Sequence, residues 1–453
     1  MSVEVWIDQR HVGNAVVEVR AGFQKPSLTF TYLDEWLADG RGFAISPDLP
    51  LQRGPHTPAP HRVTFLAFDD AAPDKWGRDL LDARARMEAK DSGKPIVWST
   101  EIDRLFAVDD ETRQGALRFR RDGEFLAREG ARASVHELQA LAQAAQRFAD
   151  SGEIDHEMAC LIGAGSSPGG AQPKAWVRGE NGEMMMAKFP RGSDNIDASA
   201  WELTAMKLQA RAGIRVQPSS IVSLGIGRSA FLTQRFDRQD GSRVPYMSFK
   251  NAFAIQEFEN PDYASLARRV THISASPDQD AAELFTRAAM LAMVNNIDDH
   301  MRNHGLLRTS TGWRLSPSFD VNPARHGRSS TPLTPQDDPG NRDIRLLVDA
   351  ADEFRLTQAQ AVERITVVNE AVSHWQEDAA SCGIDGAEIA FMASAFEGPN
   401  RQRADALRPV AGIIIDTNSA SGRVANTSNG DVWVQPHHRD GKLVEGHFRR
   451  RRH

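Results

Sequence analysis

The spacing of apolar residues changes along the chain. In the first half, short runs such as Val3 to Ile7 alternate apolar with polar positions and end at turn residues, which is typical of strands. In the second half, apolar residues recur three or four positions apart: over 278–295, Leu284, Ala288 and Leu291 share one stripe. This change predicts an α+β protein with a sheet-rich N-terminal half and a mostly helical C-terminal half.

The same pattern predicts individual helices and four consecutive segments. Ser134 and Glu137 form a capping box ahead of an apolar stripe, which predicts a helix over 134–149. Further helices are expected at 75–87, 197–213, 357–372 and 385–396. Because 453 residues exceed a single core, we expect a sheet-rich subdomain at 1–130, a small lobe at 131–248, a helical lobe at 249–408, and a linker with a hairpin tail at 409–453.

Composition and charge narrow the class of protein. The formal net charge of −7 argues against a protein that binds nucleic acid mainly through its own surface. The cysteines, Cys160 and Cys382, lack the spacing of a zinc site, and we expect no disulfide. No apolar run reaches membrane-spanning length, so we expect a cytoplasmic protein. The basic hairpin at 431–452 is either a solvated appendage or a contact for nucleic acid or an acidic partner.

One polar stretch in the helical half carries candidate chemistry. Asp298 and Asn303 follow the helix at 278–295, and Asp320 comes soon after them. Phosphoryl transfer needs a carboxylate that accepts the proton of the attacking hydroxyl, and oxygen ligands that hold Mg²⁺ against the phosphates. We predict that Asp298 positions the hydroxyl and that Asn303 and Asp320 bind Mg²⁺. Because an Asp-x4-Asn pattern is common by chance, this interpretation needs a nucleotide site upstream.

A candidate nucleotide site precedes this stretch. The loop Gly163 to Gly170 is rich in Gly and Ser and can bring backbone N–H groups close to phosphate oxygens. Lys188, on the strand that follows, can add a cation, although Lys174 competes for that role. Glu202 can either pair with Lys188 or only stabilise the start of its own helix. Loop, lysine, glutamate and Asp-x4-Asn follow one another in the order of a protein kinase.

Together these residues make the chain resemble a known family, the HipA-type serine/threonine kinases of bacterial toxin–antitoxin systems. The motifs that carry the resemblance are Pro73-Asp74-Lys75-Trp76-Gly77-Arg78, Gly115-Ala116-Leu117-Arg118-Phe119, Ser167-Pro168-Gly169-Gly170-Ala171-Gln172-Pro173-Lys174, Gln234-Arg235-Phe236-Asp237-Arg238, Asp298-Asp299-His300-Met301-Arg302-Asn303-His304-Gly305 and Leu315-Ser316-Pro317-Ser318-Phe319-Asp320-Val321-Asn322-Pro323. The resemblance implies a two-lobed protein-kinase-like fold that uses ATP and Mg²⁺. The tail beyond residue 408 is not part of it.

The resemblance also implies roles for individual residues. ATP contacts are expected from Gly163, Gly165, Ser166, Ser167, Gly169, Gly170, Ala171, Lys188, Glu202, Gln234, Phe236, His300, Asn303 and Asp320. Ser167 is the expected autophosphorylation site, with Ser166 as the alternative, because a phosphate there would repel ATP and switch the kinase off. Two roles stay open: His300 can act only by orienting its loop, and Asp237 can pair a neighbouring arginine rather than contact nucleotide.

The resemblance further implies partners. A toxin of this kind would phosphorylate a translation component such as an aminoacyl-tRNA synthetase. It would also bind a HipB-like helix-turn-helix antitoxin and reach operator DNA through it. The residues leave two other functions open, namely a catalytically silent nucleotide-binding corepressor module and a lipid or small-molecule kinase. Residues 325–341, just after Asp320, are either an activation-type segment or a plain surface loop.

Overall fold

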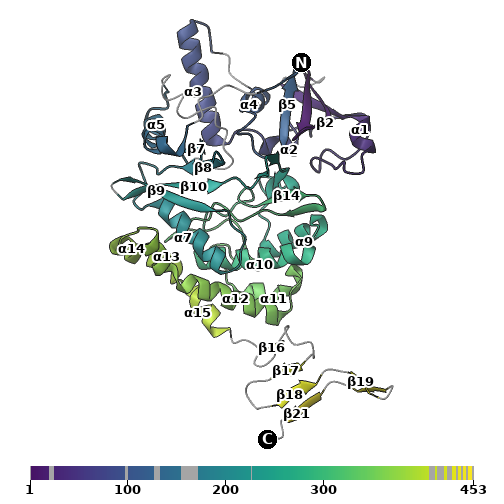
Figure 1. Ribbon diagram of the computed structural model, residues 1–453, viewed down its shortest axis with the longest axis vertical. Coiled ribbons are helices and arrows are strands. Elements are labelled where there is room, and N and C mark those ends of the chain that lie inside the picture. Colours follow the sequence, from purple (N-terminus) through teal and green to yellow (C-terminus); the bar gives the residue numbers. More distant parts are fainter. Residues whose placement is uncertain are drawn as a thin grey trace.

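The computed structural model describes residues 2–19, 25–96, 100–126, 133–154, 172–225 and 227–407, and beyond these only the backbone of short strands. Its first part is an antiparallel sheet of order β4-β3-β2-β1-β5-β6 (Figure 1). The strands are β1 (Ser2–Ile7), β2 (Arg10–Val19), β3 (Pro26–Tyr32), β4 (Pro55–His56), β5 (Leu117–Arg121) and β6 (Glu124–Phe125). Val3, Val5 and Ile7 point to the buried face of β1, as the alternation predicts.

Four helices accompany this sheet in the chain: α1 (Asp34–Ala38), α2 (Leu66–Asp70), α3 (Lys75–Ser92) and α4 (Glu101–Ala107). The helix α3 begins where Asp74 accepts a hydrogen bond from the backbone N–H of Gly77, and it ends at Gly93 in the left-handed conformation. It is longer than the helix that the sequence predicts over 75–87.

The middle part is a small antiparallel sheet with one helix before it in the chain and a second helix between two of its strands. Its order is β7-β8-β10-β9, formed by β7 (Lys174–Arg178), β8 (Met184–Lys188), β9 (Ser219–Gly225) and β10 (Arg228–Gln234). The 3-10 turn η1 (Val135–Glu137) and α5 (Leu138–Ser151) precede the sheet, and α7 (Ala198–Arg211) lies between β8 and β9. The capping box of Ser134 and Glu137 is present, which confirms the predicted start of this helical stretch.

The last large part is mostly helical and holds the candidate catalytic stretch. Its helices are α8 (Phe249–Ala252), α9 (Tyr263–Ile273), α10 (Pro277–Met293), α11 (Arg345–Asp349), η2 (Ala351–Phe354), α12 (Gln358–Ser373), α13 (Trp375–Ser381), α14 (Gly386–Phe396) and α15 (Pro399–Ala406). The short pair β11 (Arg238–Gln239) and β12 (Ser242–Arg243) joins the two lobes in the chain, and β13 (Tyr246–Ser248), β14 (Gly305–Thr309) and β15 (Gly312–Leu315) form a further sheet. In Figure 1 the helices α7, α9, α10 and α12 lie below the small sheet.

Three groups of buried apolar side chains follow these parts. One fills the N-terminal sheet, and one runs through the helical lobe together with α7. The third joins the small sheet and α5 to Trp76 and Leu80 of α3. Trp76 packs edge-on against Phe148, with ring centroids 5.1 Å apart. The α+β, kinase-like architecture is therefore as predicted, while the four segment boundaries stay predictions.

The tail contributes strands that pair among themselves. The strands β16 (Ile414–Ile415), β17 (Arg423–Ala425), β18 (Asp431–Val434) and β21 (His447–Arg450) form one sheet, and β19 (His437–Arg439) pairs with β20 (Lys442–Val444). The predicted hairpin is thus seen as the pairing of β18 with β21.

Candidate active site

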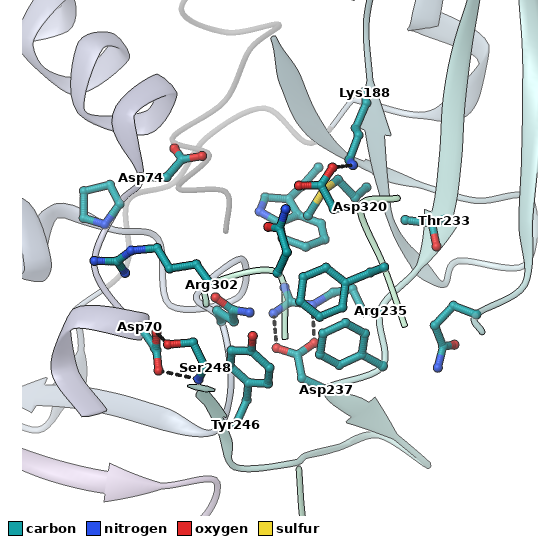
Figure 2. Close-up of a pocket in the computed structure, with 18 of the residues that line it drawn as sticks. Asp70, Asp74, Lys188, Thr233, Arg235, Asp237, Tyr246, Ser248, Arg302 and Asp320 are labelled. Carbon is teal, nitrogen blue, oxygen red and sulfur yellow. Dashed lines mark hydrogen bonds and ion pairs between the residues drawn. The ribbon is translucent and has the colours of Figure 1, made fainter. Parts of the chain in front are cut away.

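A cavity of about 510 Å³ lies where all three large parts of the chain meet. The N-terminal part contributes residues 69–70, 72–75, 78–79 and Gln114. The small lobe contributes Lys188 and Phe231, among others, and the helical lobe contributes residues 302–303 and 318–320. In Figure 2 the pair of Lys188 and Asp320 lies on one side, and Asp70 with Ser248 lies on the other. The resemblance of the sequence implies two lobes, but it does not predict this third wall of the cavity.

Lys188 is held between two carboxylates. Its Nζ lies 2.7 Å from Oε1 of Glu202 and 2.6 Å from Oδ1 of Asp320. The lysine ends β8, directly opposite Phe231 of β10, and Glu202 projects from α7. The pairing of Lys188 with Glu202 that the order of motifs predicts is therefore present.

The charges of Lys188, Glu202 and Asp320 shift one another's pKa values. Although burial opposes it, Asp320 and Glu202 raise the pKa of Lys188, so this lysine stays charged. Burial raises the pKa of Glu202 to about 6, against the opposing charge of Lys188. Burial also acts to raise the pKa of Asp320, but Lys188 outweighs it and lowers that pKa to about 2. Strongly perturbed pKa values of this kind, caused by burial and by specific charge partners in a cavity, mark a candidate functional site.

The candidate catalytic loop begins directly after α10. Asn295 takes a positive φ of 49°, and its side-chain amide donates to the carbonyl of Ala324, which turns the chain out of the helix. Asp298 follows with a side chain that is 71% exposed, so its carboxylate is accessible from solvent. Asn303 donates from Nδ2 to the carbonyl of Asp298 at 2.9 Å, so the two residues are fixed relative to each other.

The oxygen atoms needed for Mg²⁺ are available on two of the predicted residues. Among the described residues, Oδ1 of Asn303 is buried and has no hydrogen-bond partner, and both Asn303 and Asp320 line the cavity. Asp320 is held at a positive φ of 59°, a backbone strain that is common at functional sites. Hard oxygen donors such as these suit Mg²⁺, and Asn303 and Asp320 would hold the ion if it binds here. The residues present therefore fit this metal ion.

His300 lies close to Asp298 and influences Asp320 electrostatically. Its Nε2 is 3.7 Å from Oδ1 of Asp298, and its charge is one of the influences that lower the pKa of Asp320. Its Nδ1 is buried without a hydrogen-bond partner among the residues that the structure describes. Both interpretations of His300, as nucleotide contact and as support for the loop, stay predictions.

Asp299 anchors the catalytic loop through hydrogen bonds to other parts of the helical lobe. It is 1% exposed and accepts hydrogen bonds from the hydroxyl of Tyr263 at 2.8 Å and from Nη1 of Arg342 at 3.2 Å, and Nε2 of His304 lies 2.9 Å away. Burial would raise the pKa of Asp299, but His304 and Arg342 outweigh it and lower that pKa. The hydroxyl of Thr331 also donates to the backbone carbonyl of Asp299.

Part of the segment 325–341 packs against this anchor and part of it is exposed, so its interpretations as an activation-type segment and as a surface loop both stay predictions. Ser329, Thr331 and Thr334 are 6%, 2% and 2% exposed, and the carbonyl of Pro332 accepts from the backbone N–H of Tyr263. Packing against the catalytic loop, rather than polarity, decides the position of these residues.

The segment between the lobes is tied to the N-terminal part. Gln234 and Phe236 line the cavity, and Phe236 packs on Phe319 with ring centroids 5.3 Å apart. Asp237 pairs with Arg235 at 2.6 Å and accepts from the backbone N–H of Gly115 at 2.6 Å.

Two arginines complete this connection. Arg235 and Arg238 donate to the backbone carbonyls of residues 111–115. Although burial opposes it, Arg235 and Arg238 lower the pKa of Asp237 to about 2. The pairing of Asp237 with arginine is therefore the observed one.

A second buried ion pair joins α3 to β7. Nζ of Lys174 lies 2.8 Å from Oδ2 of Asp74, and Nε1 of Trp76 donates to the carbonyl of Lys174 at 3.0 Å. Lys174 therefore serves the contact between parts of the chain, while Lys188 faces the other carboxylates. The motif at 73–78 is visible in the sequence, but its partner is nearly a hundred residues away, so the sequence does not reveal this contact.

The predicted phosphate loop is outside the structure's description. Gly163, Gly165, Ser166, Ser167, Gly169, Gly170 and Ala171 all belong to residues 155–171, which lie outside the described residues. Their roles, including the assignment of Ser167 or Ser166 as an autophosphorylation site, stay predictions. No helix among the described residues is long and apolar enough to cross a membrane.

Comparisons with known proteins identify the family of the chain. Residues 3–97 match the model of the HipA N-terminal domain, and residues 166–375 match that of the HipA-like C-terminal domain. A curated relative, the putative kinase Y4mE of Sinorhizobium fredii, is 23% identical over 233 residues, which are 47% of this chain and 54% of the relative. The match thus spans about half the length of that relative.

Solved structures resemble the fold to different extents. HipA of Shewanella oneidensis MR-1, solved with HipB and its operator DNA, aligns with a TM-score of 0.61 at 16% identity, over 90% of this chain and 99% of that chain. The proinflammatory kinase CtkA of Helicobacter pylori aligns with a TM-score of 0.33 at 16% identity, over 53% of this chain and 94% of that chain.

Proposed function

The chain belongs to the HipA-type family, and from this premise we propose that it is an ATP-dependent serine/threonine protein kinase that acts as the toxin of a toxin–antitoxin pair. The observation that carries the proposal is the meeting of Lys188, Glu202, Asn303 and Asp320 at one cavity. A scaffold that had lost catalysis would have no need to keep a buried cation between two carboxylates, since their desolvation is costly.

The cavity offers a place for each part of the nucleotide. Phe231, Phe236 and Phe319 supply an apolar section suited to an adenine ring, with Gln234 beside it. Lys188, released from Asp320 by the incoming ligand, would hold phosphate oxygens while Glu202 keeps its ammonium in place.

The exposed Asp298 would orient the acceptor hydroxyl and take its proton. Asn303, through its hydrogen bond to the carbonyl of Asp298, fixes the distance between this carboxylate and the phosphates. When bound by Asn303 and Asp320, Mg²⁺ would neutralise charge on the phosphate oxygens. The acceptor would be a serine or threonine of a translation component such as an aminoacyl-tRNA synthetase.

The proposal includes partners and a switch. A HipB-like helix-turn-helix antitoxin would bind the chain and connect it to operator DNA, as the solved Shewanella oneidensis complex contains HipA, HipB and its operator DNA. Autophosphorylation at Ser167, or at Ser166, would place a dianionic group in the predicted phosphate loop and stop nucleotide binding. Phosphopeptide mapping after incubation with ATP tests the position, and a phosphate found elsewhere would remove the switch.

Incubation with labelled ATP and Mg²⁺ tests the central claim. We expect label in the unchanged protein, and a loss of at least about a hundredfold in Asp298→Asn, since a positioned base contributes this much. Asp352→Asn, which alters an exposed carboxylate of η2 away from the cavity, is the matched control and should keep full activity. ATP binding without transfer to any protein would favour the corepressor module, and transfer to a small molecule would favour the lipid or small-molecule kinase.

A further inference from the structure

Arg302 is a cation of the catalytic loop that the roles above do not use. It directly precedes Asn303, lines the cavity and is exposed. Among the described residues it makes no hydrogen bond and no ion pair, although most other arginines around the cavity are paired. In Figure 2 it lies on the side of the N-terminal wall, with Asp70 and Asp74 about it. An unpaired guanidinium in a cavity is a ready binding group for an anion.

The carboxylates around Arg302 are already engaged. Asp70 accepts hydrogen bonds from the backbone N–H and the hydroxyl of Ser248, both at 2.8 Å. Asp74 holds Lys174 with one oxygen and caps α3 with the other. The cavity wall therefore supplies charge near Arg302 but no direct partner for it.

A second cation lies beside Arg302. The backbone N–H of Lys250 in α8 donates to the carbonyl of Met301 at 3.0 Å, which places Lys250 next to the loop. After burial, the charge of Arg302 is the largest influence that lowers the pKa of Lys250. The carboxylate of Glu257 is 3.8 Å from Lys250 on a side chain that is 94% exposed, so it offers little compensation. Asp69 also raises the pKa of Lys250, but its carboxylate is already bonded to Arg62 and Thr64.

The position of Arg302 favours a contact with the acceptor protein rather than with the nucleotide. Lys188, Asn303 and Asp320 would surround the phosphates, whereas Arg302 lies beside Asp70. Burial raises the pKa of Asp70 to about 6, although hydrogen bonds and the charge of Arg302 oppose this. It is also only four positions beyond Asp298, the residue that meets the acceptor hydroxyl. A side chain at this place reaches groups next to the acceptor residue.

We propose that Arg302, with Lys250 beside it, binds an acidic side chain of the acceptor protein close to the phosphorylated serine or threonine. The proposal rests on the function proposed above and specifies its substrate class. An aspartate or glutamate there would give Arg302 the charged partner that the chain does not supply. Specificity would then come from electrostatic pairing beside the reacting hydroxyl.

Matched peptides test the preference by kinetics. Serine peptides that carry Glu at each position flanking the serine would be compared with the same peptides carrying Gln or Lys. We expect the kcat/KM of the best Glu peptide to exceed that of its Gln counterpart about tenfold, which is the effect of one charge-assisted hydrogen bond. Arg302→Gln should remove this preference while leaving the KM for ATP unchanged, and Arg302→Glu should shift it towards Lys peptides. Arg53→Gln, an exposed arginine of the N-terminal part, is the control.

A binding measurement separates this proposal from the proposed function. Labelled Glu and Gln peptides would be titrated into Asp298→Asn protein with ADP and Mg²⁺, where no turnover is needed, and anisotropy recorded with and without Arg302→Gln. Preference for Glu that disappears with Arg302→Gln supports the acceptor site even if no transfer is found. Equal affinity for Glu and Gln peptides, or an Arg302→Gln variant that loses ATP affinity instead, overturns it.

Discussion

Glu202 is a buried carboxylate whose protonation has a calculable effect on stability. Burial raises its pKa from 4.5 to about 6 in the folded protein. In the unfolded chain this carboxyl group loses its proton at a lower pH than in the folded protein. The free energy of unfolding therefore falls as the pH rises from about 4.5 through about 6. Relative to the unchanged protein, Glu202→Gln should therefore gain up to about 2 kcal/mol in free energy of unfolding between about pH 4.5 and 7.5. Urea titrations at both pH values measure this gain.

The control for this prediction is an exposed carboxylate. Glu397→Gln, beyond the end of α14, should show no comparable change between the two pH values. A gain for Glu202→Gln that is the same at both pH values would mean that the substitution acts through packing rather than through ionisation.

At this scale, residues with a local signature were predictable from the sequence. Lys188 follows an apolar run, and Asp298 and Asn303 have a fixed spacing, so each could be singled out before the fold was known, while their catalytic and metal-binding roles stay predictions. Asp299 could not, because its importance comes from Tyr263 and Arg342, which lie dozens of residues away on either side. Burial and partners across the fold, rather than residue type, separate Asp299 from its exposed neighbour.

The contact of α3 with β7 depends on one buried ion pair. Asp74→Asn keeps the hydrogen bond that caps α3, since Asn is an equally good cap, but it leaves Lys174 buried without a carboxylate. Loss of one partner of a buried pair costs about 3–5 kcal/mol. We expect that loss in urea unfolding, and much of it should return when Lys174→Met is added. A single variant with unchanged stability would contradict the role of the pair.

The hydrogen bonds by which Asp299 anchors the catalytic loop should affect both kcat and the free energy of unfolding. Tyr263→Phe removes the hydroxyl that donates to Asp299 and should cost about 1–3 kcal/mol, while loosening the loop that carries Asp298. We expect kcat to fall about tenfold with KM for ATP unchanged, because positioning of the acceptor suffers rather than nucleotide binding. Steady-state kinetics and urea unfolding of the same preparation measure both effects.

Tyr32→Phe provides the comparison. It removes a buried hydroxyl that donates to the carbonyl of Leu49 in the N-terminal part, far from the catalytic loop. It should cost similar stability and leave kcat unchanged. If both variants lowered kcat equally, the fall would reflect general destabilisation.

The tail is separable from the rest of the molecule by its strand pairing. The described strands β16 to β21 pair only with one another, so removal of residues 408–453 should leave the melting temperature and ATP binding of residues 1–407 unchanged. Differential scanning fluorimetry with and without ATP checks this. A lower melting temperature would show that the tail packs on the body.

At the scale of the whole molecule, the sequence predicts the parts better than their assembly. The change from alternating to helical periodicity was enough for the α+β class, and caps such as that of Ser134 located helices closely. The third wall of the cavity could not be predicted, because Asp70 and Gln114 line the cavity only once the N-terminal part packs against the two lobes. Docking is set by surfaces that no local pattern encodes.

The connection between residues 111–115 and 235–238 has a consequence for synthesis. The backbone N–H of Gly115 finds its acceptor in Asp237, which is 122 residues later in the chain. At about 5–20 residues per second, a ribosome needs roughly 6–25 s to deliver that partner. During this time the N-terminal part emerges with its docking groups open to water and to other chains. The yield of the protein in a cell would then depend on how well this exposed surface is shielded during synthesis, rather than on the speed of folding itself.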